Sequence, residues 1–269
     1  MTQISKDAPI AEHRKNSRKG GKQLLITYEV FSNKGRRDIN EDYAGAFEKN
    51  GRYCFVLCDG LGGHGMGDAA SQCVVETFKT QFNEYTAELK DFLPETFEMA
   101  QDFLLGEQIA RNAKTKMKTT AVAMLTDGVN IYIGHIGDSR CYAFGKKKVK
   151  FRTLDHSVPQ MLVISHEIKE SEIRNHPDRS LVLKAMGTKW EDGPEYEIMK
   201  EKKLRGLRAF LLCSDGFWEL IEEKQMCELL KSSSTVKEWV DGMVEIIWKN
   251  GEGKNMDNFS AVAVWNTKE

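Results

Sequence analysis

Residues 121–136, AVAMLTDGVNIYIGHI, contain the clearest structural signal in the 269-residue chain. Two apolar runs, 121–125 and 129–136, flank Asp127-Gly128, a dipeptide that is typical of tight turns between antiparallel strands. The stretch 119–136 is therefore predicted to form a β-hairpin. Similar short runs rich in β-branched and aromatic residues predict further strands at 24–31, 53–58, 141–144, 148–153, 209–213 and 259–265.

Longer amphipathic segments separate these groups of strands. Apolar residues recur at helical spacing over 68–85 and 92–117, and again over 218–231 and 235–249. Because the predicted helices come as consecutive pairs, a regularly alternating parallel sheet is not expected. The pattern favours an α+β fold in which antiparallel sheets have helices packed outside them.

Composition limits the classes of function. The chain is 41% hydrophobic and 29% charged, which is typical of a soluble globular protein, and its longest apolar run, 53–58, is too short to span a membrane. The 39 basic and 40 acidic side chains nearly cancel, which argues against nucleic acid as a partner. Six cysteines without a CxxC pair, and without a signal peptide before them, predict a cytoplasmic protein.

The ends of the chain differ in character from its middle. Residues 1–22 hold six Lys or Arg side chains and almost no apolar pattern, which predicts a flexible basic tail. Residues 23–269 contain no internal repeat and no linker rich in Pro or Gly, and they are expected to form a single catalytic domain.

Acidic residues adjoin four predicted strands, and one further acidic pair, at 41–42, follows a turn rich in Gly and Arg. They are Glu41 with Asp42, Asp59, Asp138, Asp215 and Asp257. If these side chains converge on one pocket, their charges repel one another unless cations neutralise them, and an all-oxygen set selects Mg²⁺ or Mn²⁺ over zinc. Such a site suits a two-metal hydrolase that cleaves phosphoesters. The spacing alone does not distinguish a protein phosphatase from a nuclease or a small-phosphoester hydrolase.

Six short motifs, taken in order, resemble the metal-dependent protein phosphatase family of type 2C. They are GRRDINED (35–42), DGLGGH (59–64), GDSR (137–140), DHS (155–157), SDG (214–216) and DNFS (257–260). The resemblance runs from about residue 28 to residue 265, and the segment at about 155–187 is similar to the flap of bacterial members. It implies a four-layer αββα sandwich, in which two antiparallel β-sheets are flanked by pairs of helices and a metal centre lies at one end between the sheets.

The resemblance also implies an activity and a set of site residues. The expected enzyme is a Mg²⁺- or Mn²⁺-dependent serine/threonine phosphatase, in which a metal-bridging hydroxide attacks phosphoserine or phosphothreonine directly. By position, the ligands of two core ions are Asp42, Asp59, the carbonyl of Gly60, Asp215 and Asp257. Glu41 matches a residue that acts near these ions through water, and Asp138 matches the ligand of a third, weaker site. Arg37 matches the phosphate-binding arginine, and its planar guanidinium suits two phosphate oxygens.

Some positions depart from the family pattern. Leu61 stands where some members carry a histidine that is a candidate general acid, so the acid is unassigned. His64 is a candidate either for proton donation or for holding Asp59. Lys118 and His166 stand where glycine is common, and they are expected to alter loop shape without touching the ligands.

The expected partners are phosphorylated proteins and a cognate serine/threonine kinase, without nucleic acid or membrane, and a monomer is favoured. The alternative function is a catalytically silent module of the same fold that binds phosphoproteins. The physiological substrate is not specified by these residues.

Overall fold

The computed structural model describes residues 24–61, 65–203 and 206–268. The predicted tail, 1–22, and His64 lie outside the described residues. The strands are β1 (Leu24–Asn33), β2 (Asp42–Lys49), β3 (Arg52–Asp59), β4 (Ala121–Thr126), β5 (Asn130–Ile136), β6 (Arg140–Phe144), β7 (Val149–Arg152), β8 (Glu197–Lys203), β9 (Ala209–Cys213) and β10 (Phe259–Lys268). The helices are α1 (Gly67–Glu84), α2 (Leu89–Ala110), α3 (Val158–Ile164), α4 (Asp215–Trp218), α5 (Glu223–Ser232) and α6 (Val236–Asn250), with a 3₁₀ helix, η2 (Glu170–Asn175).

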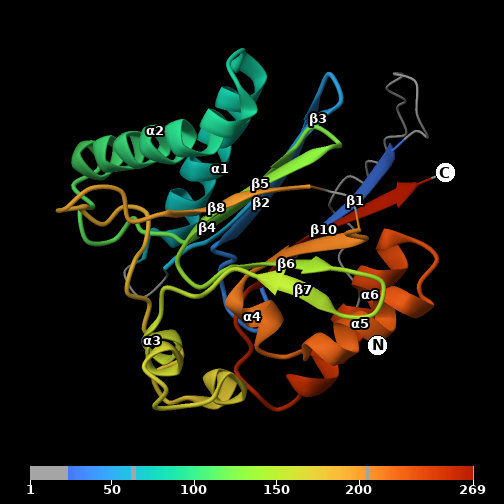
Figure 1. Ribbon diagram of the computed structural model, residues 1–269. Coiled ribbons are helices and arrows are strands. Elements are labelled where there is room, and N and C mark those ends of the chain that lie inside the picture. The colour runs from blue at the N-terminus through green and yellow to red at the C-terminus, as the bar shows by residue number, and fades with distance from the viewer. Residues whose placement is uncertain (1–23, 62–64, 204–205, 269) are drawn as a thin grey trace.

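Two antiparallel five-stranded sheets form the centre of the molecule (Figure 1). One sheet has the strand order β1-β10-β9-β6-β7, and the other has the order β2-β3-β4-β5-β8. Helices α1 and α2 pack on the outer face of the second sheet, whereas α5 and α6 pack on the outer face of the first. The predicted α+β class and the four-layer αββα sandwich are confirmed.

Strand β3 shows why its sequence is apolar at every position from 54 to 58. Successive side chains in a strand point to opposite faces, so Phe55 and Leu57 enter the layer between the sheets. Cys54, Val56 and Cys58 point the other way and pack beneath α1 and α2. All five side chains are completely buried. A strand that is covered on both faces lacks the polar alternation of a half-exposed one.

Two strands, β2 and β8, were missed by the sequence pattern. Each is an edge strand of the second sheet. Strand β2, DYAGAFEK, contains small residues, and β8, EIMKEKK, is mostly charged. Edge strands often carry charged residues that discourage pairing with other chains, and this weakens the apolar signal on which strand prediction depends.

The helix predictions were correct in kind but wrong at several ends. The helix predicted over 92–117 spans Leu89–Ala110, and just beyond its end Asn112 takes up a left-handed conformation (φ 51°) that stops it. Of the helix predicted over 218–231, the later part forms α5, whereas residue 218 ends the short helix α4 and 219–222 are not helical. Helix α6 matches its prediction closely, because the Thr235 hydroxyl accepts a hydrogen bond from the backbone N–H of Glu238 and fixes the start.

The segment 155–187 contains α3 and η2, neither of which was predicted. Between them, His166 has a φ of 64°, in the left-handed region that favours glycine. This conformation explains why glycine suits the position that His166 occupies.

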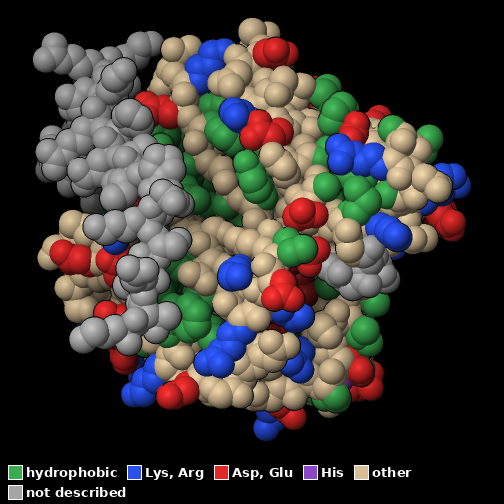
Figure 2. Space-filling view, turned by 180° about the vertical axis from the view of Figure 1, so that it is seen from behind, with side chains coloured by type: hydrophobic (Ala, Val, Ile, Leu, Met, Phe, Trp, Pro, Cys, Tyr) green, Lys and Arg blue, Asp and Glu red, His purple; other side chains and the backbone are tan. Residues whose placement is uncertain are grey.

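The surface carries both signs of charge. Acidic and basic side chains are interspersed over the face in Figure 2, in keeping with the near balance of charge in the sequence. Among the helices that the structure describes, none is both long enough and apolar enough to cross a membrane.

Candidate active site

A cleft of about 790 Å³ opens where strand ends from both sheets meet. Its wall includes these predicted site residues: Arg37, Glu41, Asp59, Gly60, Asp138, Asp215 and Asp257. Asp42 lies beneath the cleft surface with only 5% of its area exposed. The fold therefore brings residues that are more than 200 positions apart in the sequence to one place.

Strand pairing brings the first two carboxylates together. The antiparallel register of β2 and β3 sets Asp42 directly opposite Asp59. Asp42 Oδ2 accepts a hydrogen bond of 2.8 Å from Ser214 Oγ, but Oδ1 is buried and has no partner among the described residues. A buried carboxylate oxygen without a donor is costly, and a bound cation would satisfy it. This orphaned oxygen fits the metal centre that the sequence predicts.

The other sheet supplies two further carboxylates. Asp215 begins α4, one residue after the end of β9, and lines the cleft together with Asp59. Asp257 precedes β10, and its Oδ2 accepts a hydrogen bond of 2.8 Å from Arg37 Nη2. The side chains of Arg37 and Asp257 are both about half exposed, at 47% and 45%.

The electrostatics of this group also favour cations. Burial raises the pKa of Asp42 to about 7 and that of Asp215 to about 6. Burial, reinforced by neighbouring carboxylates, raises the pKa values of Asp59 and Asp138 well above their usual range. Such groups resist ionising together unless positive charge lies among them. Oxygen ligands of this kind prefer hard divalent ions such as Mg²⁺ and Mn²⁺.

Two glycines allow the start of α1 to approach the end of β3. A Cβ atom on Gly60 would lie 2.4 Å from the Gly67 carbonyl, and one on Gly67 would lie 2.8 Å from Glu41 Oε1. Side chains at either position would push the two backbones apart. The Gly67 backbone hydrogen-bonds to the Glu41 carboxyl group, whose pKa is raised mainly by burial. The contact holds Glu41 at the cleft.

Asp138 sits on a loop that is held from several sides. Its carbonyl accepts a hydrogen bond of 3.0 Å from Trp218 Nε1, and the Arg140 guanidinium lies 3.4 Å from the centre of the Trp218 ring. Arg140 also forms a bidentate ion pair with Asp155, at 2.8 and 2.6 Å. The side chains of Arg140 and Asp155 are almost completely buried. The ion pair therefore fixes Arg140, which packs on Trp218, and Trp218 in turn holds the Asp138 carbonyl.

Replacing Arg140 by methionine is expected to lower the free energy of unfolding by about 3 kcal/mol, because it removes the bidentate partner of the buried Asp155 carboxylate and leaves only the longer, 3.6 Å contact with Arg152. Urea denaturation of the two proteins measures the difference. Arg111→Met removes a half-exposed pair with Glu107 and is the matched control, expected to cost less than about 1 kcal/mol. Equal losses in the two variants would contradict the argument.

Two residues that position the site had no assigned role in the sequence analysis. Ser214 Oγ donates to Asp42 and accepts from the Ser260 backbone N–H at 2.9 Å, so it ties the two sheets together. Asn258 Nδ2 donates to the carbonyls of Lys34 and Ile39, both at 2.9 Å, and thereby shapes the loop that carries Arg37. Their sequence signal is that they stand in the motifs SDG and DNFS, where each directly neighbours a predicted ligand, Asp215 or Asp257.

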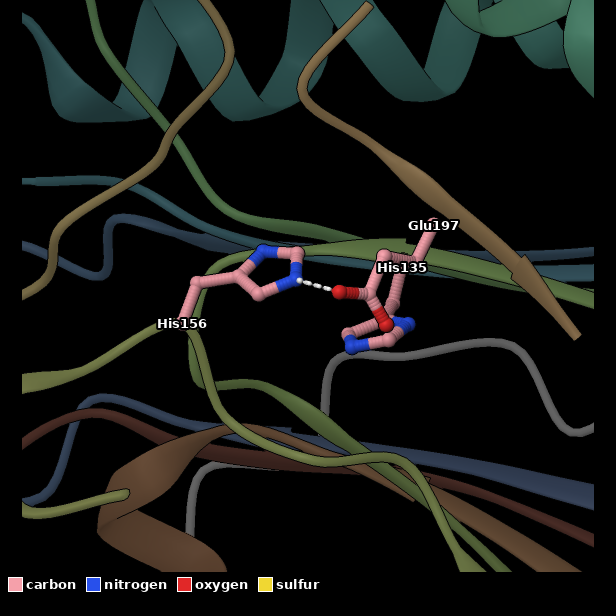
Figure 3. A group of neighbouring side chains, drawn as sticks. All are labelled: His135, His156 and Glu197. Atoms are coloured by element: carbon pink, nitrogen blue, oxygen red, sulfur yellow. Dashed lines mark ion pairs between the residues drawn. The ribbon is translucent and has the colours of Figure 1, made fainter. Parts of the chain in front are cut away.

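A second group of potential metal ligands lies away from this cluster of carboxylates. His135, His156 and Glu197 place one ligand atom each within 4.8 Å of the others (Figure 3). The two imidazole rings are stacked, with centroids 4.8 Å apart and planes inclined by 21°. His156 Nε2 lies 3.2 Å from Glu197 Oε1, the contact drawn in Figure 3.

The geometry of this group favours two neutral imidazole rings over cation binding. His156 Nδ1 accepts from the Gly137 N–H at 3.2 Å, so its Nε2 carries the proton, and this Nε2 lies close to Glu197 without forming a well-aligned hydrogen bond. Nearly parallel rings also direct their in-plane lone pairs into separate planes, which suits shared coordination of one ion poorly. Burial lowers the pKa values of both histidines, that of His156 to about 4, which keeps them neutral. The hydrogen bond from the Gly137 N–H to His156 Nδ1 stabilises the turn before Asp138.

Comparisons with known proteins agree with this geometry. The family model for protein phosphatase 2C matches residues 32–259. The serine/threonine phosphatase Stp of Listeria monocytogenes is 30% identical over 220 residues, which cover 79% of this chain and 86% of that protein.

Solved structures show the same similarity. Stp1 from Staphylococcus aureus shares 26% identity with a TM-score of 0.80, covering 94% of this chain and 99% of that one. The catalytic domain of the phosphatase PstP, solved with two manganese ions, shares 25% identity with a TM-score of 0.77, covering 91% of this chain and 100% of that one. With the matched family model spanning most of its length, this chain belongs to the protein phosphatase 2C family, and it resembles the bacterial members of that family.

Proposed function

We propose that this protein is a Mg²⁺- or Mn²⁺-dependent serine/threonine phosphatase that acts on phosphorylated proteins. The convergence of several aspartates and Arg37 on one open cleft carries the proposal. The serine/threonine phosphatase activity named for its relatives supports the choice of substrate class. A serine/threonine kinase that phosphorylates the same proteins is the proposed antagonist.

In this proposal the residues divide the work between them. Asp42, Asp59, Asp215, Asp257 and the Gly60 carbonyl hold two cations, Glu41 acts through water, and Asp138 serves a third, weaker site. When bound, the cations supply an activated water for direct attack on phosphorus and offset negative charge. Arg37 uses one nitrogen on Asp257 and is half exposed, so its other N–H groups can bind phosphate oxygens.

Phosphate release from a phosphothreonine peptide tests the proposal. The metal-stripped protein is titrated with Mn²⁺ and with Mg²⁺, and turnover restored by either ion is the expected result. A protein that binds Mn²⁺ and the phosphopeptide but releases no phosphate would instead be the silent phosphoprotein-binding module. A side-by-side rate comparison with a small phosphoester and with DNA identifies the preferred substrate class.

Arg37→Ala is expected to lower kcat/KM for the phosphopeptide by about 10- to 100-fold, because the cleft loses its bidentate donor to phosphate. Arg37→Lys should recover only part of the loss, since an ammonium lacks the planar fork. Arg36→Ala alters an exposed neighbour on the same loop and provides the control. Steady-state kinetics that showed equal effects at positions 36 and 37 would remove Arg37 from phosphate binding.

A further inference from the structure

The cleft has a partly apolar rim formed by residues 180–185, a segment that leaves a turn at Ser180, forms a β-bridge at Val182 and bends at Leu183. All six of these residues line the cleft alongside the predicted metal ligands. Leu181 and Leu183 are 51% and 52% exposed, whereas Val182 between them is less exposed. This alternation is that of a strand with one side turned outward. Ile39, 60% exposed, stands on the Arg37 loop and lines the same cleft.

Backbone hydrogen bonds hold this segment firmly in place. Val158 N donates to Leu181 O at 3.1 Å, and Leu183 N donates to His156 O at 2.7 Å, so Val182 pairs with Ser157 in an antiparallel bridge. Farther along, Met186 and Thr119 exchange hydrogen bonds of 2.9 and 3.2 Å. The segment is therefore a preformed surface of the kind that binds without a large ordering cost.

The outer edge of the segment is open. In an antiparallel bridge of this kind, the N–H and C=O groups of the central residue point away from the partner strand. Those of Val182 therefore point away from Ser157, and they make no backbone hydrogen bond with any residue that the structure describes. Such an edge is a template for an added strand.

We propose that residues 180–185 bind the substrate polypeptide as an added β-strand, with aliphatic side chains near the phosphorylated residue packing on Leu181 and Leu183. The inference rests on the proposed phosphatase function and narrows its substrates to extended phosphopeptides with apolar flanks. Main-chain hydrogen bonds supply affinity that is independent of sequence, and alternate side chains supply the preference. A peptide held on this rim lies beside the carboxylates and Arg37.

Two phosphothreonine peptides test the preference, one with leucine two residues before and after the phosphothreonine and one with serine there. The expected kcat/KM with Mn²⁺ is about tenfold higher for the leucine peptide. Leu181→Ser/Leu183→Ser should reduce this ratio to near one. Ile164→Ser, on α3 and 53% exposed but away from the cleft lining, should keep it. An equal rate for both peptides with the unaltered protein would overturn the proposal.

Peptides with altered backbones test strand addition while the protein is left unchanged. N-methylation of the leucine peptide at successive positions should lower kcat/KM about tenfold at alternate residues only, because every second N–H faces Val182. Uniform losses along the peptide would overturn the strand model.

Further results would distinguish a failure of this inference from a failure of the proposed phosphatase function. Turnover of p-nitrophenyl phosphate and of both peptides without discrimination would refute only the inference. No phosphate release from any substrate would refute the proposed function as well. Self-association that Leu181→Ser/Leu183→Ser abolished, measured by sedimentation, would assign the rim to a second copy of this chain and overturn the proposal.

Discussion

Asp59→Asn is expected to lower the Mn²⁺-dependent kcat/KM for a phosphothreonine peptide by on the order of 10³-fold, about 4 kcal/mol of transition-state stabilisation. Asp59 lines the cleft with Asp215 and lies opposite Asp42, so its loss is expected to disturb proposed ligands from both sheets. Its backbone is held independently, because Asp59 N donates to Thr120 Oγ1 at 3.0 Å and Asp59 O accepts from Thr120 N at 2.8 Å. The variant should therefore fold.

The same variant provides a second measurement that does not depend on turnover. Metal-free Asp59→Asn should be more stable at neutral pH than the unaltered protein, because the amide removes a buried group whose pKa is raised by burial and by Asp42. The control is Asp68→Asn, which neutralises an exposed carboxylate of the same cleft. It should change kcat/KM by less than about threefold. Full activity in Asp59→Asn would exclude the proposed ion centre.

The buried aspartates are expected to destabilise the metal-free protein progressively as the pH rises from about 4 to about 7, against the smaller, opposite contribution of the histidines, of which His156 has its pKa lowered to about 4. Burial raises the folded-state pKa of Asp42 from 3.8 to about 7 and that of Asp215 from 3.8 to about 6. The folded protein therefore keeps protons that the unfolded chain releases, and stability falls until both folded groups are ionised. For Asp42 alone the shift corresponds to about 4 kcal/mol.

Thermal unfolding at pH 5 and at pH 7.5, with and without Mn²⁺, checks this prediction. Mn²⁺ should raise the Tm more at pH 7.5, where the carboxylates bind it without releasing protons. The difference in unfolding free energy between Asp42→Asn and the unaltered metal-free protein isolates one group from the other acids, and it should grow with pH. A difference independent of pH would show that Asp42 titrates normally.

Much of the sandwich could be predicted from local patterns. Strand β3 and the hairpin formed by β4 and β5 carry strong apolar signals because helices or the opposite sheet cover both faces. Strands β2 and β8 could not be recognised in this way, since at the sheet edges their stability comes from pairing rather than from their own side chains. Helix ends also escaped prediction where a single left-handed residue, such as Asn112, terminates the helix.

The sequence allowed the residues of the candidate site to be predicted, but not the contacts between them. The positions of Asp59, Asp138 and Asp215 after apolar strands pointed to a shared end of the fold. The hydrogen bond from Ser214 to Asp42 joins residues 172 positions apart, and no local pattern contains it. The pairing of Arg37 with Asp257 likewise depends on how two distant loops meet.

The division of the predicted ligands between the two sheets has a mechanical consequence. Asp42 and Asp59 belong to one sheet, whereas Asp215 and Asp257 adjoin strands of the other, and the layer between includes Leu57, Leu212 and Val262. The spacing of the carboxylates therefore depends on the thickness of this interior layer. Enlarging or shrinking its side chains is expected to change the affinity of the proposed metal centre for its ions, because it changes the distance between the two sheets that carry the carboxylates.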